Sequence, residues 1–389
     1  MKREPENFDG VQENAYYLRI SAKLRTAKYL LLFLMIATAV LVLFAYRSNI
    51  TYDNLRYLLR DMDEAGNAGA RSDTVYYAPE SSNFYLNFRG DVAVCSKNGV
   101  SLHRALGGRS FEDKVRFTAP VAEASSKYMI VYDVGGTAFY LYNSLSRVYE
   151  ETIDFPIYDG AVARDGSFAV LLKNRTGGFL IRLYDRNFKL VGELTRSGYV
   201  TDIAFGADGR LLICECAEEG GGFTAVFSAY KTGGETLDFS ISAEGFPLLC
   251  GGFAEEFYLL LDHSLIFYSS AGEKSFSTSF GTSEILRASA SDTGICVYVQ
   301  ENVSGAQCGV YAFFADGSTF AFPAERGASD VLLTESGRAY LLYDGVLMAC
   351  TEAGVRTEEI PLGGRALLAG DGDSVLVCYD DYAKSFAVK

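Results

Sequence analysis

The two histidines are the residues that could most readily serve a metal centre or a catalytic triad. His103 and His263 lie far apart in the chain, with no other histidine to join them. A histidine-based zinc site or Ser-His-Asp triad therefore finds no support in their spacing. We expect each to be a strand residue with a local hydrogen bond.

Eight cysteines lie in or beside apolar stretches rather than in turns. Cys214 and Cys216 flank one residue and would share a strand face, too close for a relaxed disulfide with each other. No CxxC pair, which a zinc site would favour, occurs. We expect most thiols to be buried; an even count outside the membrane would also permit disulfides, and free external thiols would imply a reducing habitat. The eight are Cys95, Cys214, Cys216, Cys250, Cys296, Cys308, Cys350 and Cys378.

Other motifs give little chemistry. Asp61-x-Asp63-x-x-Gly66 resembles the start of a calcium loop, but two later ligand positions hold Ala and Ser. The Gly-rich segment Glu218–Phe223 predicts a long hairpin loop, and no phosphate-binding loop or nucleophile elbow occurs. Carboxylates are abundant, but the sequence does not indicate which of them pair. We therefore predict no catalytic, cofactor-binding or metal residues, and no cofactor.

The charge is distributed unevenly along the chain. The 389 residues carry a formal net charge of −14, with 49% hydrophobic residues. The first 28 residues hold six basic and four acidic side chains and residues 29–46 hold none of either, so the remainder of the chain is strongly acidic. An acidic domain repels a phosphate backbone, which argues against nucleic acid as a partner.

Residues 29–46 form one uncharged apolar run, Tyr29 to Tyr46, reading YLLLFLMIATAVLVLFAY. As a helix this run would rise about 27 Å, close to the roughly 30 Å apolar core of a bilayer. Tyrosines stand at both ends, as expected at a membrane interface. We predict one uncleaved transmembrane helix acting as a signal anchor; a cleaved signal peptide and a buried core helix are the alternatives.

Basic residues near this run give the orientation. Four precede it closely and three follow it: Arg19, Lys23, Arg25 and Lys28, then Arg47, Arg56 and Arg60. The positive-inside rule then predicts a cytoplasmic basic tail at residues 1–28 and the C-terminal domain outside the cell membrane. Residues 47–73 should hold a short juxtamembrane helix, at about 49–63, and a Gly-rich linker, at about 64–73.

From residue 74 to 389 the sequence repeats. Eight apolar runs of strand length recur about every 40 residues, many after a turn containing glycine. Each has an apolar stretch before it, an often aromatic stretch after it, and a more polar fourth stretch. The runs begin at Val92, Tyr128, Phe168, Leu211, Phe257, Ile295, Ala339 and Val375.

Four strands per repeat of this length are typical of a β-propeller blade. A solenoid coil is usually shorter, and tandem sandwiches would repeat over a longer span. We predict an all-β propeller at 74–389, preceded by the transmembrane helix, with eight blades favoured and seven possible. The last unit is short, so Thr74–Ala78 is the candidate strand that closes the ring.

Two segments of the repeats, Asp91–Val100 (DVAVCSKNGV) and Phe179–Asp185 (FLIRLYD), look like WD40-like or quinoprotein-like repeats. Through them the chain resembles an uncharacterised family of clostridial single-pass membrane proteins with such a propeller. True WD40 and quinoprotein repeats contain Trp, and this chain has none. The resemblance therefore implies an architecture without catalytic residues.

Two classes of function remain open at this stage. We expect a membrane-anchored binding or scaffolding module at the outer face of the cell membrane, contacting the bilayer through 29–46 and another protein or envelope component through its propeller. The alternative is a ligand sensor or enzyme that uses the central channel. Fold alone does not separate the two.

Overall fold

A computed structural model describes residues 9–45, 74–79, 83–104, 108–175, 177–231, 236–253, 256–301, 307–370 and 374–387. The chain divides into two compact units, Met1–Ala68 and Gly69–Lys389, each described by itself. The predicted juxtamembrane helix, the linker and the calcium-like motif lie outside the described residues.

The first unit contains α1, which runs from Asp9 to Ala45. It begins well before Tyr29, so residues 9–28 of the predicted basic tail are helical. Across the described residues, no helix combines the length and apolar character that a bilayer crossing requires. The transmembrane helix at 29–46, whose last residue lies outside the described set, stays a prediction.

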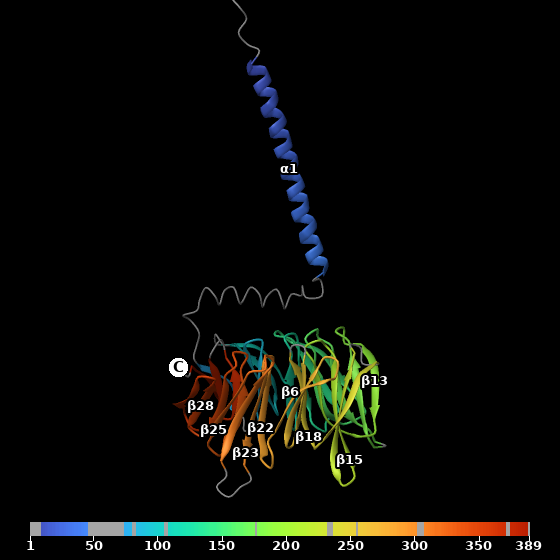
Figure 1. The fold of residues 1–389 in the computed structure, drawn as a ribbon, viewed down its shortest axis with the longest axis vertical. Helices are drawn as coiled ribbons and strands as arrows, with labels where there is room; N and C mark the ends of the chain where they lie inside the picture. The colour runs from blue at the N-terminus through green and yellow to red at the C-terminus, as the bar shows by residue number, and fades with distance from the viewer. Residues whose placement is uncertain are drawn as a thin grey trace, which may run out of the picture. The chain divides into compact units, whose positions relative to one another are not determined.

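The second unit consists of eight four-stranded antiparallel sheets, the blades of a propeller (Figure 1). In blades 1 to 7 the four strands are consecutive in the chain. The bounds for blades 1 to 4 are β2 (Phe84–Phe88), β3 (Asp91–Ser96), β4 (Gly99–His103), β5 (Arg109–Asp113); β6 (Pro120–Ala124), β7 (Met129–Asp133), β8 (Ala138–Tyr142), β9 (Arg147–Thr152); β10 (Ile157–Val162), β11 (Phe168–Lys173), β12 (Phe179–Tyr184), β13 (Leu190–Arg196); β14 (Tyr199–Phe205), β15 (Leu211–Glu219), β16 (Gly222–Tyr230) and β17 (Leu237–Glu244).

Blade 8 differs because its outer strand comes from the other end of the domain. The bounds for blades 5 to 8 are β18 (Pro247–Phe253), β19 (Glu256–Leu261), β20 (Ser264–Ser269), β21 (Lys274–Ser279); β22 (Glu284–Ser291), β23 (Gly294–Gln300), β24 (Cys308–Phe314), β25 (Thr319–Ala324); β26 (Asp330–Leu333), β27 (Ala339–Tyr343), β28 (Val346–Thr351), β29 (Gly354–Glu359); β30 (Ala366–Ala369), β31 (Val375–Cys378), β32 (Tyr382–Phe386) and β1 (Thr74–Tyr76). The eight predicted apolar runs are the second strands of the eight blades, which confirms the eight-bladed prediction.

Ring closure follows the prediction made from the spare strand at residue 74. Strand β1 pairs antiparallel with β32, with Val75 opposite Ala383. The hydroxyl of Tyr77 then donates to the carbonyls of Tyr379 and Tyr382, each at 2.7 Å. Pairing the two ends of the domain gives blade 8 its fourth strand and covers the outer edge of β32.

The core is a ring of apolar clusters, one between each pair of neighbouring blades. Both faces of a second strand pack against another blade, so β11 is buried almost throughout and shows no alternation. Aromatic side chains fill much of this space; the rings of Phe168 and Tyr184 stack with centroids 4.5 Å apart.

The propeller has two loop-bearing faces. We call the BC face the one that carries the turns between second and third strands and the connections between blades; the AB face carries the remaining turns. The predicted loop Glu218–Phe223 is a tight hairpin on the BC face: β15 and β16 continue to Gly220 and Gly221, whose positive φ angles of 63° and 84° only glycine adopts readily. This hairpin projects at the lower edge of the propeller in Figure 1.

Candidate functional site

The first strands of neighbouring blades contact one another around the ring and are therefore its innermost strands. The outer edge of each of these strands pairs with its own blade, which leaves backbone N–H groups on the inner edge without a ladder partner. Side chains of the preceding blade accept these N–H groups. Ile203 donates to Asp159 Oδ2 at 3.3 Å, and Leu367 donates to Asp330 Oδ2 at 2.7 Å.

The same arrangement recurs at other blades. Val162 N donates to Glu123 Oε1 at 3.4 Å, and Cys250 N donates to Asp202 Oδ2 at 2.7 Å. Ser289 replaces the carboxylate in blade 6, where its Oγ accepts from Leu333 N at 3.1 Å. These side chains therefore join consecutive blades at the centre of the ring.

Glu123, Asp159 and Asp202 come from three consecutive blades and influence one another electrostatically. Burial raises the pKa of Glu123 well above its ordinary value, and the nearby Asp159 and Asp202 raise it further. Burial and the charge of Asp159 raise the pKa of Asp202 to about 7. The hydroxyl of Tyr132 donates to Asp159 Oδ1 at 2.9 Å, which opposes the rise that burial causes in the pKa of Asp159.

We call Glu123, Asp159 and Asp202 the acidic cluster, and their contacts bear on whether the central channel could serve a ligand sensor or an enzyme. The three carboxylates keep some accessible surface, so protons can reach them. However, each accepts a backbone N–H of the next blade, and no group of three His, Cys, Asp or Glu side chains within the described residues has the arrangement to hold a metal ion. The observed contacts favour a structural role over acid–base chemistry.

The BC face of blades 3 to 5 exposes large apolar side chains. We call the aromatic patch the set Tyr158, Tyr199, Phe223 and Leu248, of which Tyr199 is 50% and Phe223 51% exposed. Tyr158 and Tyr199 both pack edge-on against the ring of Phe179, with centroids 5.5 and 5.3 Å away. The patch is therefore built on rigid strand ends rather than on a free loop.

Register shifts help to place this patch. In blades 3 and 5 the inner strand is irregular between Ile157 and Asp159 and between Pro247 and Leu249. Tyr158 is the extra residue in blade 3 and Leu248 is the extra residue in blade 5. A β-bulge turns the side chain of such a residue out of the regular alternation. The ammonium group of Lys173 makes a cation–π contact with the same ring, with Nζ 4.1 Å from the centroid of Phe179.

Acidic side chains lie beside the part of the patch that blades 4 and 5 contribute. Glu218, Glu244 and Asp262 are exposed on the same face of blades 4 and 5. Asp262 accepts from the backbone N–H of Phe246 at 3.1 Å, and the ring of Phe246 meets that of Phe223 edge-on at 5.4 Å. The surface thus combines exposed aromatic rings with negative charge.

The histidines occupy separate places, as expected. His103 ends β4, is buried, and its Nε2 lies 2.9 Å from Ser101 Oγ, which confirms a strand residue with a local hydrogen bond. His263 is not a strand residue: it lies in the turn between β19 and β20, with Nδ1 2.6 Å from Asp262. The apolar run and strand β19 both end at Leu261, so His263 lies in the turn that follows.

The eight cysteines are free thiols, and seven are buried while Cys216 is half-buried. The expectation of mostly buried thiols is confirmed, and the alternative of disulfides among them is not observed. Burial raises the pKa of Cys95 to about 12.

A cavity of about 370 Å³ opens on the AB face between blades 3 and 4. Its polar lining includes Asp165 and Asp185, but backbone N–H groups of their own turns occupy these carboxylates. The remaining walls, including Leu183 and Phe205, are apolar.

The inner carboxylates were not singled out by the sequence, although a signal exists. Three of the first stretches read YDGAV, TDIAF and SDVLL, each with one aspartate before small or apolar residues. A lone acid at the same place in three of the repeats indicates a shared structural position. The sequence gives no comparable signal for the aromatic patch, because exposed and buried aromatic residues follow no regular pattern in blades 3 to 5.

Comparisons with known proteins agree with this architecture. A model of a family of unknown function (DUF5711) matches residues 71–246. No curated protein matches the chain.

Among solved structures, BamB from Moraxella catarrhalis aligns with a TM-score of 0.53 and 11% identity over 81% of this chain and 98% of that chain. The domain has a β-propeller fold. PorZ of Porphyromonas gingivalis aligns with a TM-score of 0.49 and 15% identity over 78% of this chain and 42% of that chain. The Cps50 (Swd1) propeller domain of Myceliophteria thermophila aligns with a TM-score of 0.45 and 10% identity over 70% of this chain and 99% of that chain. The predicted propeller fold is confirmed, and part of the chain matches a family without assigned function; the clostridial, single-pass and quinoprotein-like parts of the resemblance stay predictions.

Proposed function

We propose that this chain is a membrane-anchored protein-binding module whose propeller engages a partner through the BC face of blades 3 to 5. The observation that carries the proposal is the aromatic patch. Exposed aromatic side chains on rigid supports are characteristic of protein interfaces, where they bury a large area at little entropic cost. Large apolar side chains gathered on one face of a soluble domain usually mark an interaction site.

The charge around the patch suggests the chemistry of the partner. Glu218, Glu244 and Asp262 are exposed beside the aromatic rings. A complementary protein surface would present apolar side chains with Lys or Arg at the rim. Opposite charge accelerates such association more than it strengthens it.

The route of the chain is compatible with a tether. Strand β1 begins and strand β32 ends at the AB face, so both described ends of the propeller leave the BC face unobstructed. We propose that residues 29–46 anchor the chain in the cell membrane, supported by their uncharged apolar sequence, with the N-terminus cytoplasmic and the propeller outside.

The binding proposal is tested by removing the patch. Full-length protein carrying Tyr199→Ser and Phe223→Ser should lose at least about 90% of the partner recovered after crosslinking of intact membranes, since such anchors typically contribute 2 kcal/mol or more each. A matched control, Leu190→Ser with Val191→Ser, removes two exposed apolar side chains from the outer strand β13. Equal loss in both variants would contradict the proposal.

The membrane proposal is tested separately by reporter fusions after residue 389. An active alkaline phosphatase and an inactive cytoplasmic reporter are expected. The opposite pattern would place the propeller inside the cell and overturn the orientation without touching the binding proposal.

A further inference from the structure

The outer strand of each blade pairs on one side only. In blade 4 the outer strand is β17, the last in the sheet order β14-β15-β16-β17, and within the described residues no strand pairs with its outer edge. With eight residues, β17 is the longest of the outer strands. A free edge of this length presents a row of backbone N–H and C=O groups to other chains.

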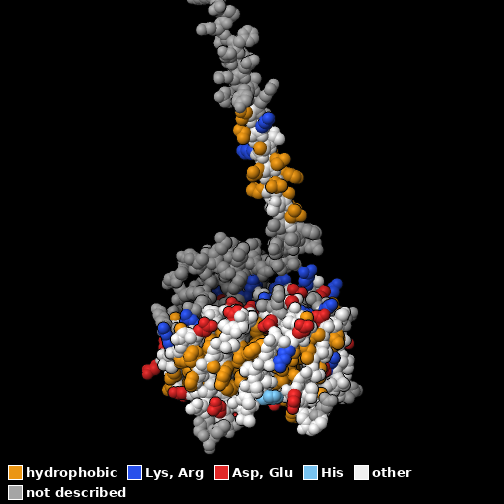
Figure 2. All heavy atoms as spheres, in the orientation of Figure 1, with side chains coloured by type: hydrophobic (Ala, Val, Ile, Leu, Met, Phe, Trp, Pro, Cys, Tyr) orange, Lys and Arg blue, Asp and Glu red, His pale blue; other side chains and the backbone are white. Residues whose placement is uncertain are grey.

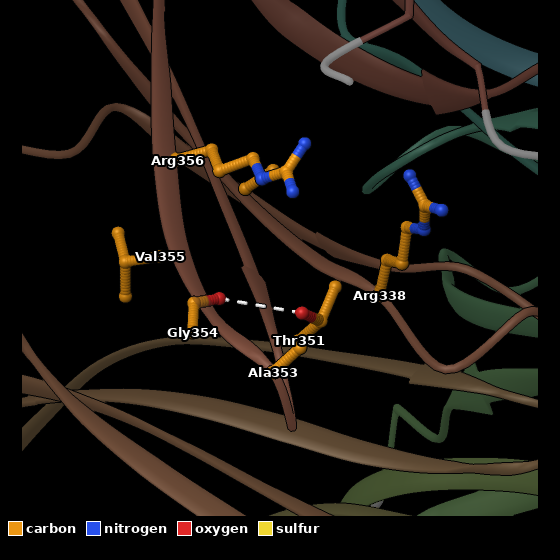
Figure 3. Close-up of a pocket in the computed structure, with 7 residues that line it drawn as sticks. Arg338, Thr351, Ala353, Gly354, Val355 and Arg356 are labelled. Carbon is orange, nitrogen blue, oxygen red and sulfur yellow. Dashed lines mark hydrogen bonds between the residues drawn. The ribbon is translucent and has the colours of Figure 1, made fainter.

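Most of the other outer strands carry features that discourage such pairing. Charged side chains occur within β5, β9, β13 and β29, β21 begins with a lysine, β25 contains a proline, and β1 has only three residues. Figure 3 shows one of these charged side chains, Arg356, extending from β29. Charges, prolines and short length are the usual protections of an edge strand.

Strand β17 lacks these protections over most of its length. Between the bulge at Asp238 and the terminal Glu244, residues 239–243 read FSISA, without a charge, a proline or a register shift. Phe239 and Ile241 are only partly buried against the cluster between blades 4 and 5. Figure 2 shows hydrophobic side chains over the side wall of the propeller, where outer strands lie, with Lys and Arg mainly at the upper edge.

The ladder with β16 fixes the direction of the free backbone groups. The N–H of Gly245 donates to the carbonyl of Phe223 at 2.9 Å, so these two residues form a hydrogen-bonded pair. Hydrogen-bonded and non-hydrogen-bonded pairs alternate along an antiparallel ladder. Ser240, Ser242 and Glu244 therefore belong to non-hydrogen-bonded pairs, and their N–H and C=O groups point away from β16 toward the free edge.

The free edge is continuous with the aromatic patch. Strand β17 ends at the BC face, where Glu244 lies opposite Thr224, the residue after Phe223. Phe223 in turn lies opposite Glu218 in the β15–β16 hairpin. A chain paired with β17 would therefore reach an exposed aromatic ring and two carboxylates at the BC end of the strand.

We propose that β17 accepts an extended segment of the protein partner as an additional antiparallel strand, an inference that rests on the proposed function. Antiparallel pairing gives the more stable ladder, so the segment runs from the BC face toward the AB face. Its N-terminal end carries an apolar residue against Phe223 and a Lys or Arg beside Glu244. In the paired run alternate side chains are apolar, because they cover Phe239 and Ile241.

Selection of a displayed library of random linear peptides on the full-length protein in detergent tests this edge. Enriched peptides should carry a basic and an apolar residue followed by an alternating run. N-methylation of the alternate amides that face β17 should weaken binding at least about tenfold, since several backbone hydrogen bonds are lost together. N-methylation of the intervening amides, which face solvent, should not. Absence of enriched peptides, or equal effects in the two registers, would overturn the proposal.

Ser242→Pro supplies the test on the protein side. Its N–H points to the free edge, where proline removes a donor without breaking the sheet, so the melting temperature should be retained while the selected peptides bind at least about tenfold more weakly. Equal binding to the native protein and to this variant would contradict the pairing. If the variant melts early, the comparison of the two N-methylation registers decides alone.

Ser277→Pro is the matched control on β21, the outer strand of blade 5. The N–H of Phe280 donates to the carbonyl of His263 at 2.8 Å, so by the same alternation the N–H of Ser277 points away from β20. Peptide binding should be unchanged in this variant, and an equal loss in both proline variants would overturn the assignment to β17.

The patch variant separates this inference from the proposed function. Peptides that are lost in Ser242→Pro but retained in Tyr199→Ser with Phe223→Ser would support the edge and contradict the patch. Peptides with the reverse pattern would support the patch and overturn the edge.

Discussion

Asp202 is the side chain whose charge most directly links the propeller to pH. Its pKa is raised from an ordinary value near 4 to about 7, by burial and then by Asp159. Between these two values the folded protein binds more protons than the unfolded chain, so the free energy of unfolding must fall as pH rises from about 4 to about 7. The loss should be complete above the folded pKa.

Asp202→Asn should flatten this dependence. The amide oxygen can still accept from Cys250 N, but the residue no longer titrates. Urea unfolding at pH 5 and pH 8 should show a loss of stability smaller than in the native protein by up to roughly 3 kcal/mol, because about two pH units lie between pH 5 and the folded pKa and each corresponds to about 1.36 kcal/mol. Glu193→Gln, on the exposed outer strand β13, serves as the control. An unchanged slope in Asp202→Asn would refute the electrostatic account of the acidic cluster.

The thiols give a second residue-scale prediction. Cys216 is the one half-buried cysteine, while burial raises the pKa of Cys95 and Cys350 to about 12 and leaves little reactive thiolate. Native protein should therefore react with one equivalent of maleimide, and unfolded protein with all eight thiols. Cys216→Ser should abolish the native reaction. Rapid labelling of several native thiols would contradict the burial of the second strands.

Residue roles were the least accessible to sequence reasoning. The burial of cysteines followed from their apolar neighbours, whereas the convergence of Glu123, Asp159 and Asp202 depends on how three blades meet. Which backbone N–H each carboxylate accepts depends on how the blades pack in three dimensions. The repeat spacing alone indicates only that the acidic residues occupy equivalent positions in their blades. His263 was predicted to be a strand residue but lies in a turn. That turn has only two residues, between Leu261 and Ser264, and the sequence pattern does not distinguish so short a turn from the strands on either side.

At the scale of elements, β1 is the strand on which ring closure depends. Tyr77 is 7% exposed and its hydroxyl donates to two carbonyls of blade 8, whereas the neighbouring Tyr76 is 73% exposed. Tyr77→Phe keeps the ring but removes one hydrogen-bond donor. The carbonyl of Tyr379 keeps the hydroxyl of Tyr85, and the carbonyl of Tyr382 keeps a backbone N–H, so the substitution should cost about 0.5–1.5 kcal/mol of stability. Thermal unfolding should show a lowered melting temperature for the full-length variant.

The neighbouring tyrosine supplies the control for this comparison. Tyr76→Phe removes an exposed hydroxyl and should leave the melting temperature within experimental error. Deletion of residues 74–79 should destabilise the domain far more than either substitution, because Val75 and the pairing with β32 are lost together. Equal melting temperatures for the Tyr77 and Tyr76 variants would argue against closure through β1.

The elements themselves were largely predictable. Second strands are apolar on both faces because neighbouring blades cover them, so all eight stood out in the sequence as continuous runs. The closing strand was predictable because the last unit lacked a fourth stretch. Helix α1 was only partly anticipated: hydropathy identifies an apolar run but does not show where a helix begins, and α1 begins at Asp9.

At the scale of the whole molecule, the two faces of the propeller differ in what they offer. The BC face of blades 3 to 5 carries the aromatic patch with carboxylates beside it, while the AB face carries both described ends of the domain. A closed ring holds these surfaces at fixed positions, since every blade packs on two neighbours. We infer that the propeller presents one face for a protein partner.

Site-specific photo-crosslinking in intact cells tests this central claim most directly. A photoreactive residue replacing Phe223 on the BC face should form a crosslinked product of discrete mass, and one replacing Lys189 on the AB face should not. The product should disappear when Tyr199 is also changed to Ser, since the two rings belong to one patch. Products of equal yield from both faces, or from neither, would contradict the assignment of the BC face as the binding surface.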